Sequence, residues 1–301
     1  MKVFVTGGTG AIGRHAVPAL LGAGHEVTAL ARTREKAAAL GDQGARPAMV
    51  SLFDRRALAS AFEGHDAVVN LATAIPPMSK FMSVRAMRDN YRVRAEGSAA
   101  VADAVLDAGV GRMVQESVSM VYRDQGARWI DEDAPVDRYP MTKGNFAAEV
   151  SAHRAPCGVV LRFGWFYGPG AAHSEELFAL ARHHATMVLG DPGGYVSSIH
   201  MADAGTAVVA ALGVAAGTYN VVDDEPLTKR AFAAALARAA GARPWVRGPG
   251  RAALLLGDRI TSLTRSLRVG NARFRAASGW GPRYPSAREG WLATAEDLTS
   301  R

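Results

Sequence analysis

Short apolar runs alternate with stretches of helical periodicity along most of the chain. The first apolar run is Val3–Val5, and a helical pattern follows it over residues 16–21. Further runs typical of buried strands fall at residues 26–31, 46–50, 66–71, 112–119, 158–161 and 218–222. Helical patterns lie between them at residues 34–40, 55–62 and 81–108. Strands that alternate with helices at this spacing predict βαβ units, and therefore an α/β protein with a doubly wound parallel sheet.

A glycine turn joins the first predicted strand to the first predicted helix. Gly7, Gly10 and Gly13 follow the strand at a G-x-x-G-x-x-G spacing. Glycine lets the backbone come close to a ligand, and the start of a helix offers free N–H groups to phosphate. The strand, turn and helix together predict a site for the diphosphate of a dinucleotide. The alternative is a tight turn that binds no ligand.

The end of the second predicted strand carries the residue that distinguishes the two nicotinamide cofactors. Arg32 stands there, followed by Thr33 and Arg34. A carboxylate at this place would bind the ribose hydroxyls of NAD, whereas a guanidinium suits the 2′-phosphate of NADP. We therefore expect NADP, with NAD as the possible alternative. If Arg32 is only exposed, Thr33 is simply the N-cap of the helix over residues 34–40. Asp54 is expected to be the N-cap of the helix over residues 55–62.

A tyrosine and a lysine four residues apart follow the fifth predicted strand. The segment is Tyr139-Pro140-Met141-Thr142-Lys143. On a helix, residues at this spacing share one face, and an ammonium beside a phenol favours the phenolate. Pro140 favours an extended conformation at Tyr139, which would put Tyr139 at or before the helix cap. The pair is a candidate for acid–base catalysis, or else a proline-started helix with a chance tyrosine.

These motifs resemble the extended short-chain dehydrogenase/reductase family, which includes the sugar-nucleotide epimerases and dehydratases. The likeness begins at Thr6–Gly13 and continues through Tyr139–Lys143, Arg162–Gly170 and Val196–Ala204. It implies a Rossmann-type core of residues 1–163 that also receives residues 199–223. Residues 164–198 and 224–301 would then form a small C-terminal substrate lobe.

The resemblance also assigns roles to individual residues. It implies that Tyr139 and Lys143 are catalytic, together with Ser117 or Ser119, because Val118 stands where the family has its catalytic serine. Lys143 would also bind the cofactor ribose. The cofactor-binding residues that it implies are Gly7, Thr9, Gly10, Ala11, Ile12, Gly13, Arg32, Arg34, Ser51, Leu52, Ala72, Thr73, Lys143, Phe163 and Gly164.

Four further features leave alternatives open. Arg94 stands where the family usually has Asn, and we expect it on the surface, the alternative being that it points into the site. Glu116 is costly in a central strand unless it is paired, which makes it a site candidate. The aromatic segment Trp165–Tyr167 lines a substrate pocket or packs the crossing to the lobe. Residues 254–267 are amphipathic and basic, and we expect them to cover the substrate, the alternatives being contact with a dimer partner or with a membrane surface.

Composition argues against several classes of protein but does not identify the substrate. The chain has 301 residues, 49% of them apolar, and a net charge of +7. Its arginines are scattered, which argues against nucleic-acid binding, and no apolar stretch is long enough to predict a membrane helix. Cys157 is the single cysteine, which excludes an internal disulfide and a cysteine metal cluster. We expect a cytoplasmic protein without a bound metal that acts on a small molecule. The sequence leaves open whether it forms a homodimer.

The sequence thus favours an NADP-dependent oxidoreductase that acts on a small alcohol or ketone. One alternative is a nucleotide-sugar epimerase or dehydratase with a retained cofactor, although no clear diphosphate clamp is present in the lobe. Another is a protein that senses NAD(P) without turnover, because Val118, Pro140 and Arg94 depart from the family pattern.

Overall fold

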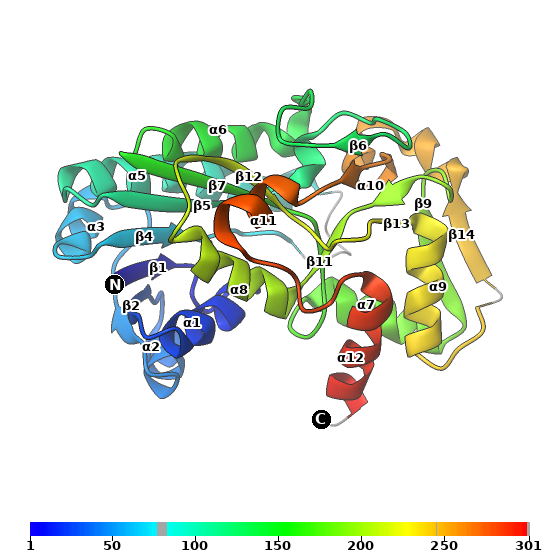
Figure 1. Ribbon diagram of the computed structural model, residues 1–301, viewed down its shortest axis with the longest axis horizontal. Helices are drawn as coiled ribbons and strands as arrows, with labels where there is room; N and C mark the ends of the chain where they lie inside the picture. The colour runs from blue at the N-terminus through cyan, green and yellow to red at the C-terminus, as the bar shows by residue number, and fades with distance from the viewer. Residues whose placement is uncertain (77–82, 245, 300–301) are drawn as a thin grey trace.

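A seven-stranded parallel sheet forms the centre of the computed structural model, which describes residues 1–76, 83–244 and 246–299 (Figure 1). The predicted helix start at Phe81 and the last two residues of the predicted lobe lie outside these ranges. From one edge to the other the strands are β3 (Arg46–Ala48), β2 (Glu26–Leu30), β1 (Lys2–Thr6), β4 (Ala67–Asn70), β5 (Arg112–Val118), β7 (Cys157–Phe163) and β12 (Gly217–Val221). Every neighbouring pair is parallel. The predicted fold class is confirmed.

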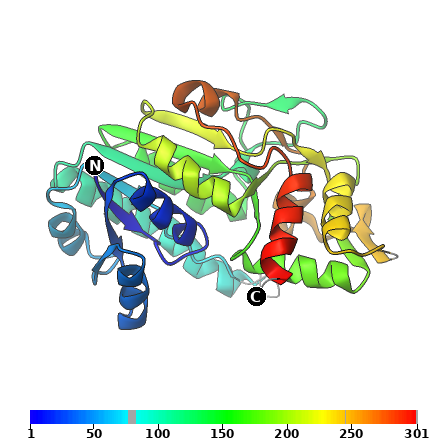
Figure 2. The same ribbon diagram turned by 60° about the horizontal axis from the view of Figure 1, so that its bottom comes forward.

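Helices cover both faces of this sheet. Helices α1 (Gly13–Gly22), α2 (Arg34–Asp42) and α8 (Met201–Ala211) lie on one face, and α3 (Arg55–Phe62), α5 (Ser98–Asp107) and α6 (Lys143–Ala152) lie on the other (Figures 1 and 2). Successive side chains of β1 point to opposite faces of the sheet and so contribute to both hydrophobic cores. Val3 and Val5 pack into the core under α1, and Phe4 packs into the core under α3. All three side chains are fully buried.

Two helices begin where the sequence predicts a cap. The Thr33 hydroxyl accepts a hydrogen bond from the Lys36 N–H, and the Asp54 carboxylate accepts one from the Ala57 N–H. Each satisfies a backbone donor that the first turn of a helix leaves free. Both predicted N-caps are confirmed.

The long helix predicted after the fourth strand is interrupted. It consists of α4 (Val84–Arg92), a π-helical turn at Val93–Gly97, and α5. A π-turn adds a residue to the turn and so rotates the side chains that follow it. This change of register affects the site, because the turn carries Arg94.

The remaining elements lie at the carboxyl ends of the sheet strands (Figure 1). They include four two-stranded sheets: β8 (Trp165–Tyr167) with β11 (Ser198–His200), β9 (Ala185–Leu189) with β14 (Val246–Gly250), β10 (Tyr195–Val196) with β13 (Leu227–Thr228), and β6 (Trp129–Ile130) with β15 (Arg268–Val269). The helices there are α7 (Ala172–Arg182), α9 (Lys229–Ala239), α10 (Thr261–Thr264) and α12 (Ala287–Thr299), and we call the elements at this end the lobe. An exception is α11 (Ala272–Ser278), which packs against β12 (Figure 1). Short 3₁₀ segments stand at Ser119–Val121, Pro140–Thr142 and Arg251–Arg259.

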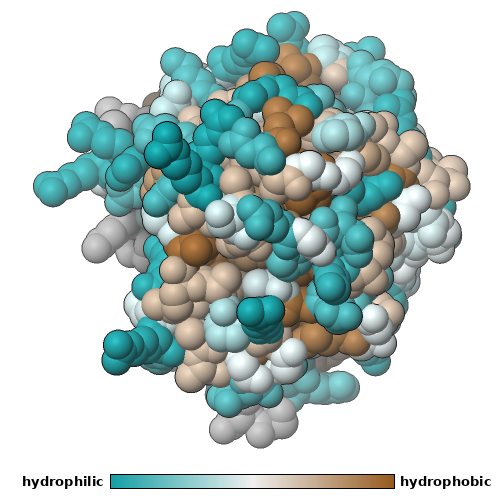
Figure 3. All heavy atoms as spheres, turned by 90° about the vertical axis from the view of Figure 1, so that its left-hand side faces the viewer, coloured by the Kyte–Doolittle hydropathy of each residue, from teal (hydrophilic) through white to brown (hydrophobic). Residues whose placement is uncertain are grey.

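The surface at the opposite end of the sheet is mixed in character. Figure 3 views the molecule from the amino ends of the strands and shows polar side chains spread among apolar ones. Within the described part of the chain, no helix combines the length and the apolar character that crossing a membrane would require.

Candidate functional site

A cleft opens at the carboxyl ends of β1, β2, β3 and β4, where the glycine turn lies. We call it the glycine cleft. Its lining residues are Thr6, Gly7, Thr9, Gly10, Leu30, Ala31, Arg32, Lys36, Met49, Val50, Ser51, Leu52, Phe53, Leu71, Ala72, Thr73 and Val93. In parallel α/β sheets, ligands bind at this edge, beside the point where the strand order reverses. Here that point lies between β1 and β4.

The glycine turn leaves no room for side chains. Gly7 has a φ of 72°, and a Cβ added to it would lie 2.6 Å from the carbonyl group of Leu71. A Cβ at Gly13 would lie 2.2 Å from the Gly7 carbonyl oxygen, so α1 begins directly against the turn. Among the described residues no hydrogen bond uses the N–H groups of Ala11 and Ile12, directly before α1, and the backbone around them is uncluttered, which fits the diphosphate of a dinucleotide.

Polar side chains fix the strands beneath this turn. The Thr6 hydroxyl donates to the Asn70 side-chain oxygen, and the Asn70 amide donates to the Ser98 hydroxyl at 3.0 Å and to the Gln115 oxygen at 2.8 Å. All four side chains are buried. They tie the ends of β1, β4 and β5 together, so the cleft is held rigid before a ligand binds.

The structure brings eight of the fifteen expected cofactor-binding residues into the lining of the glycine cleft: Gly7, Thr9, Gly10, Arg32, Ser51, Leu52, Ala72 and Thr73. The others do not line it. Ile12 and Gly13 lie buried below the turn, Ala11 and Arg34 are exposed, Phe163 and Gly164 are buried at the end of β7, and Lys143 is exposed at the start of α6.

One charged lining residue was not anticipated. Lys36 lies in the first turn of α2, four residues after Arg32, and both cations line the glycine cleft. The signal was available in the sequence, since the predicted cap at Thr33 fixes where α2 begins. None of the residues that line this cleft carries a carboxylate.

A second cavity continues along the same edge of the sheet, past the ends of β4, β5 and β7. We call it the central cavity. It is lined by Ile75, Pro76, Met87, Asn90, Arg94, Val118, Met120, Tyr139, Met141, Thr142, Asn145, Trp165, Phe166, His173 and Ser262. This cavity lies beside the other half of the sheet from the glycine cleft, and a dinucleotide bound to such a sheet spans both halves. Trp165 and Phe166 thus face cavities, whereas Tyr167 is fully buried in the lobe core.

The structure does not pair Tyr139 with Lys143. Tyr139 is extended, with φ −107° and ψ 167°, because Pro140 begins the 3₁₀ turn that follows it. Its hydroxyl donates to the Met120 carbonyl oxygen at 2.9 Å, and no hydrogen bond or ion pair joins it to Lys143 among the described residues. The cation over the Tyr139 ring is that of Arg265, at 4.6 Å. Burial raises the pKa of Tyr139 to about 12.

The two candidate serines lie in different surroundings. Ser117 is fully buried, and its hydroxyl donates to Glu149 at 2.6 Å. The same carboxylate receives two hydrogen bonds from Arg162, so Ser117 belongs to a structural network beneath the site. Ser119 lines a cavity in the lobe, and Val118 between them lines the central cavity.

The expectation that Arg94 lies on the surface is wrong. Its side chain is 3% exposed and makes two hydrogen bonds, of 2.6 and 2.9 Å, with the Glu116 carboxylate. The π-turn directs Arg94 inward, where it meets the costly carboxylate of β5. Glu116 is therefore paired, as a buried charge must be.

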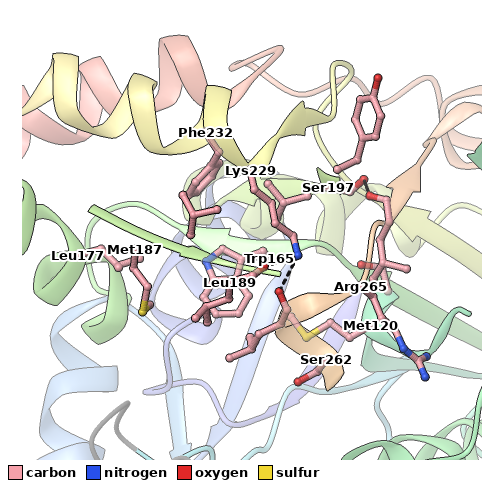
Figure 4. A pocket seen from close by; sticks show the side chains of 16 residues that line it. Met120, Trp165, Leu177, Met187, Leu189, Ser197, Lys229, Phe232, Ser262 and Arg265 are labelled. Carbon is pink, nitrogen blue, oxygen red and sulfur yellow. Dashed lines mark hydrogen bonds between the residues drawn. The ribbon is translucent and has the colours of Figure 1, made fainter. Parts of the chain in front are cut away.

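The third cavity lies in the lobe and is shown in Figure 4. We call it the lobe cavity. Its lining includes the apolar side chains Met120, Trp165, Leu177, Met187, Val188, Leu189, Val196, Phe232, Leu263 and Leu267, with the polar residues Ser119, Tyr195, Ser197, Lys229, Ser262 and Arg265. Met120, Trp165 and Ser262 border both this cavity and the central cavity. Part of the amphipathic segment 254–267 thus lines the lobe cavity.

Both cations of the lobe cavity already have partners. The Lys229 amine points into the cavity from α9 (Figure 4) and donates to the carbonyl oxygens of Leu189, Leu263 and Thr264 at 2.6, 2.9 and 2.7 Å. Arg265 donates to the Tyr122 carbonyl oxygen and to Asp137, and its guanidinium points away from Lys229 in Figure 4. Over the described residues, no cluster of three or more His, Cys, Asp or Glu side chains is arranged to hold a metal.

Fold and cleft define a dinucleotide-binding α/β protein of the doubly wound class. Residues 3–221 match the model of the NAD dependent epimerase/dehydratase family, and the chain belongs to that family. One relative of the chain is named as a reductase. The chain is 34% identical over 312 residues to a protein of a Streptomyces species named 3-diazoavenalumate denitrifying reductase, and the match covers 96% of this chain and 99% of that one.

A second relative is also named as a reductase. The chain is 30% identical over 285 residues to a protein of Stigmatella aurantiaca named 4-hydroxy-2-methyl-3-oxo-4-farnesyl-3,4-dihydroquinoline-1-oxide ketoreductase, with 89% of this chain and 82% of that one covered. Among solved structures, the human epimerase family protein SDR39U1 with NADPH superposes with a TM-score of 0.83 at 24% identity, covering 99% of this chain and 100% of that one. The chain is therefore an NAD(P)-dependent oxidoreductase of the extended short-chain type.

Proposed function

We propose that this protein is an NADPH-dependent reductase of a small, largely apolar molecule. The observation that carries the proposal is the charge of the glycine cleft, where Arg32 and Lys36 both line the region at the end of β2 and no lining residue is acidic. A 2′-phosphate adds negative charge to the adenosine half of the cofactor, and two cations there favour NADPH over NADH.

Different residues along the edge of the sheet would bind the cofactor and the substrate. The backbone from Gly7 to Ile12, up to the start of α1, would hold the diphosphate, and Ala72 and Thr73 would lie beneath the cofactor at the end of β4. When bound, the reduced nicotinamide supplies a hydride. The shared border of the central and lobe cavities, formed by Met120, Trp165 and Ser262, would bring the substrate to it.

The lobe cavity favours an apolar or aromatic substrate over a nucleotide sugar. A nucleotide-sugar enzyme needs cations for a second diphosphate, yet Lys229 is bonded to three carbonyl oxygens and Arg265 is bonded to Asp137. Trp165 and Phe232 instead offer aromatic surface. These contacts argue against the epimerase or dehydratase alternative.

Two reducible groups are candidates for the substrate, a ketone and a diazo group. A ketone, as in the quinoline-oxide relative, takes up a hydride and also a proton on its oxygen. Tyr139 is a poor source of that proton, because its hydroxyl is bonded to Met120 and burial raises its pKa to about 12. This favours a second candidate function, the reduction of a diazo group such as the Streptomyces relative's name describes. In a diazonium ion, hydride replaces dinitrogen and no proton is consumed: RN₂⁺ and NADPH give RH, N₂ and NADP⁺.

Two measurements test the proposal. Calorimetry with NADPH and NADH should show NADPH binding about tenfold or more tightly, and replacing both Arg32 and Lys36 by Ser should remove the difference while NADH binding stays the same. Equal affinities in the wild type would contradict the assignment of NADPH. Loss of nicotinamide absorbance should then require an added aromatic ketone or aryldiazonium salt. Tight NADPH binding with no turnover on either class would favour the cofactor sensor.

A further inference from the structure

The first turn of α6 presents a different pair of residues to the site from the one expected. Because Tyr139 is extended and the helix proper begins at Lys143, the two residues of this segment that lie four apart and both line the central cavity are Met141 and Asn145. Lys143 is exposed instead. The α6 side chain that faces the cavity is therefore Asn145, two residues after Lys143, while Tyr139 still lines the cavity.

Asn145 has an unused hydrogen-bond donor in this position. The residue is 3% exposed, and its side-chain nitrogen is buried without a partner among the described residues. A buried amide without a partner costs free energy, and such a group in a ligand cavity is expected to be satisfied when the ligand binds.

A second unused donor lies on the neighbouring element. Arg94 gives both terminal nitrogens to Glu116, but its Nε is buried without a partner in the described structure. Gly144 lets the two elements approach, since a Cβ there would lie 3.1 Å from the Arg94 Cβ. Glu116 neutralises the charge of the Arg94 guanidinium. The two unused donors, the Asn145 side-chain nitrogen and the Arg94 Nε, can therefore be satisfied by an uncharged oxygen acceptor.

We propose that Asn145 donates a hydrogen bond to an uncharged oxygen of the nicotinamide–ribose half of the cofactor, in the role that the sequence pattern assigns to Lys143. The proposal rests on the proposed function, which places the cofactor in this edge of the sheet. Arg94 supplies the neighbouring donor of the same subsite. The subsite is neutral, so it holds the cofactor without placing a titratable group beside the transferred hydride.

The test compares two ligands on the full-length protein. NADPH carries the nicotinamide, and 2′-phospho-ADP-ribose lacks it while keeping the adenosine and diphosphate groups. We expect Asn145→Leu to weaken NADPH about 3- to 10-fold, as the loss of one neutral hydrogen bond does, and to leave 2′-phospho-ADP-ribose unchanged. Asn145→Asp keeps the shape and replaces the donor by an acceptor, and it should weaken NADPH at least as much.

Lys143→Ala is the deciding comparison. If Asn145 holds the cofactor, Lys143→Ala should bind both ligands as the wild type does. A selective loss of NADPH affinity in Lys143→Ala, wild-type binding by both Asn145 variants, or an equal loss for both ligands would each overturn the inference. A wild-type protein that binds neither ligand would instead overturn the proposed function.

Discussion

Replacing Lys229 by Met should destabilise the lobe strongly without removing cofactor binding. The Lys229 side chain is 8% exposed, and its amine bonds the carbonyl oxygens of Leu189, Leu263 and Thr264 at 2.6 to 2.9 Å. Two of these carbonyls end the short helix α10, where no helical N–H can reach them. Methionine fills nearly the same volume but donates nothing. At about 1 kcal/mol for each acceptor left without its donor, the free energy of unfolding should fall by about 3 kcal/mol.

Thermal unfolding measures this loss. A fall of about 3 kcal/mol corresponds to a decrease in Tm of about 5 °C for a chain of this length. Lys2→Met is the matched control, since Lys2 has an exposed side chain and the same substitution there should change the stability by less than about 0.5 kcal/mol. If Lys229→Met is as stable as the wild type but loses affinity for anionic ligands, the amine is a ligand-binding group and a nucleotide-sugar substrate becomes tenable again.

Three further changes test the turn, the phenol and a buried histidine. Tyr139→Phe should retain turnover and lose about 1 kcal/mol of stability with its bond to Met120, and a hundredfold fall in kcat would contradict our view of the phenol. Gly13→Ala should abolish NADPH binding in calorimetry because its Cβ meets a carbonyl oxygen at 2.2 Å, whereas Gly22→Ala, with nothing within 4 Å, should bind normally. Burial lowers the pKa of His200 to about 4, so the native state binds fewer protons than the unfolded state between pH 4 and about 6.5. Wild-type stability should therefore fall by up to about 1.4 kcal/mol per pH unit on acidification through this range, and denaturant unfolding of His200→Gln should lack this component.

The parts of the site that depend on local sequence could be predicted. The glycine turn needs only a strand before it and a helix after it, and the caps at Thr33 and Asp54 depend on a few neighbouring residues. The effect of Pro140 on Tyr139 was equally local, and the extended conformation expected there is confirmed. Local rules also place Arg32 at the end of β2, because the strand ends where the cap of α2 begins.

The remaining features depend on contacts between distant segments. Nothing near Arg94 in the sequence indicates a π-turn, and its partner Glu116 lies 22 residues away on β5. The inward register of α6 depends on where the 3₁₀ turn ends, so Met141 and Asn145 line the central cavity beside Tyr139, and Lys143 is exposed. A motif match fixes the spacing of two residues, but it does not fix which side of the helix meets the site.

The distribution of charge along the sheet edge connects cofactor choice with chemistry. Near the central cavity, each buried arginine is matched by a carboxylate, as in Arg94 with Glu116 and Arg162 with Glu149. In the glycine cleft, Arg32 and Lys36 line the wall with no acidic lining residue beside them. In the proposed binding mode, an anionic cofactor gains its electrostatic attraction at the adenosine end, far from the transferred hydride. The reacting end would then stay close to neutral, so neither a cationic nor an uncharged electrophile would meet a repelling charge, and shape and apolar contact would select the substrate.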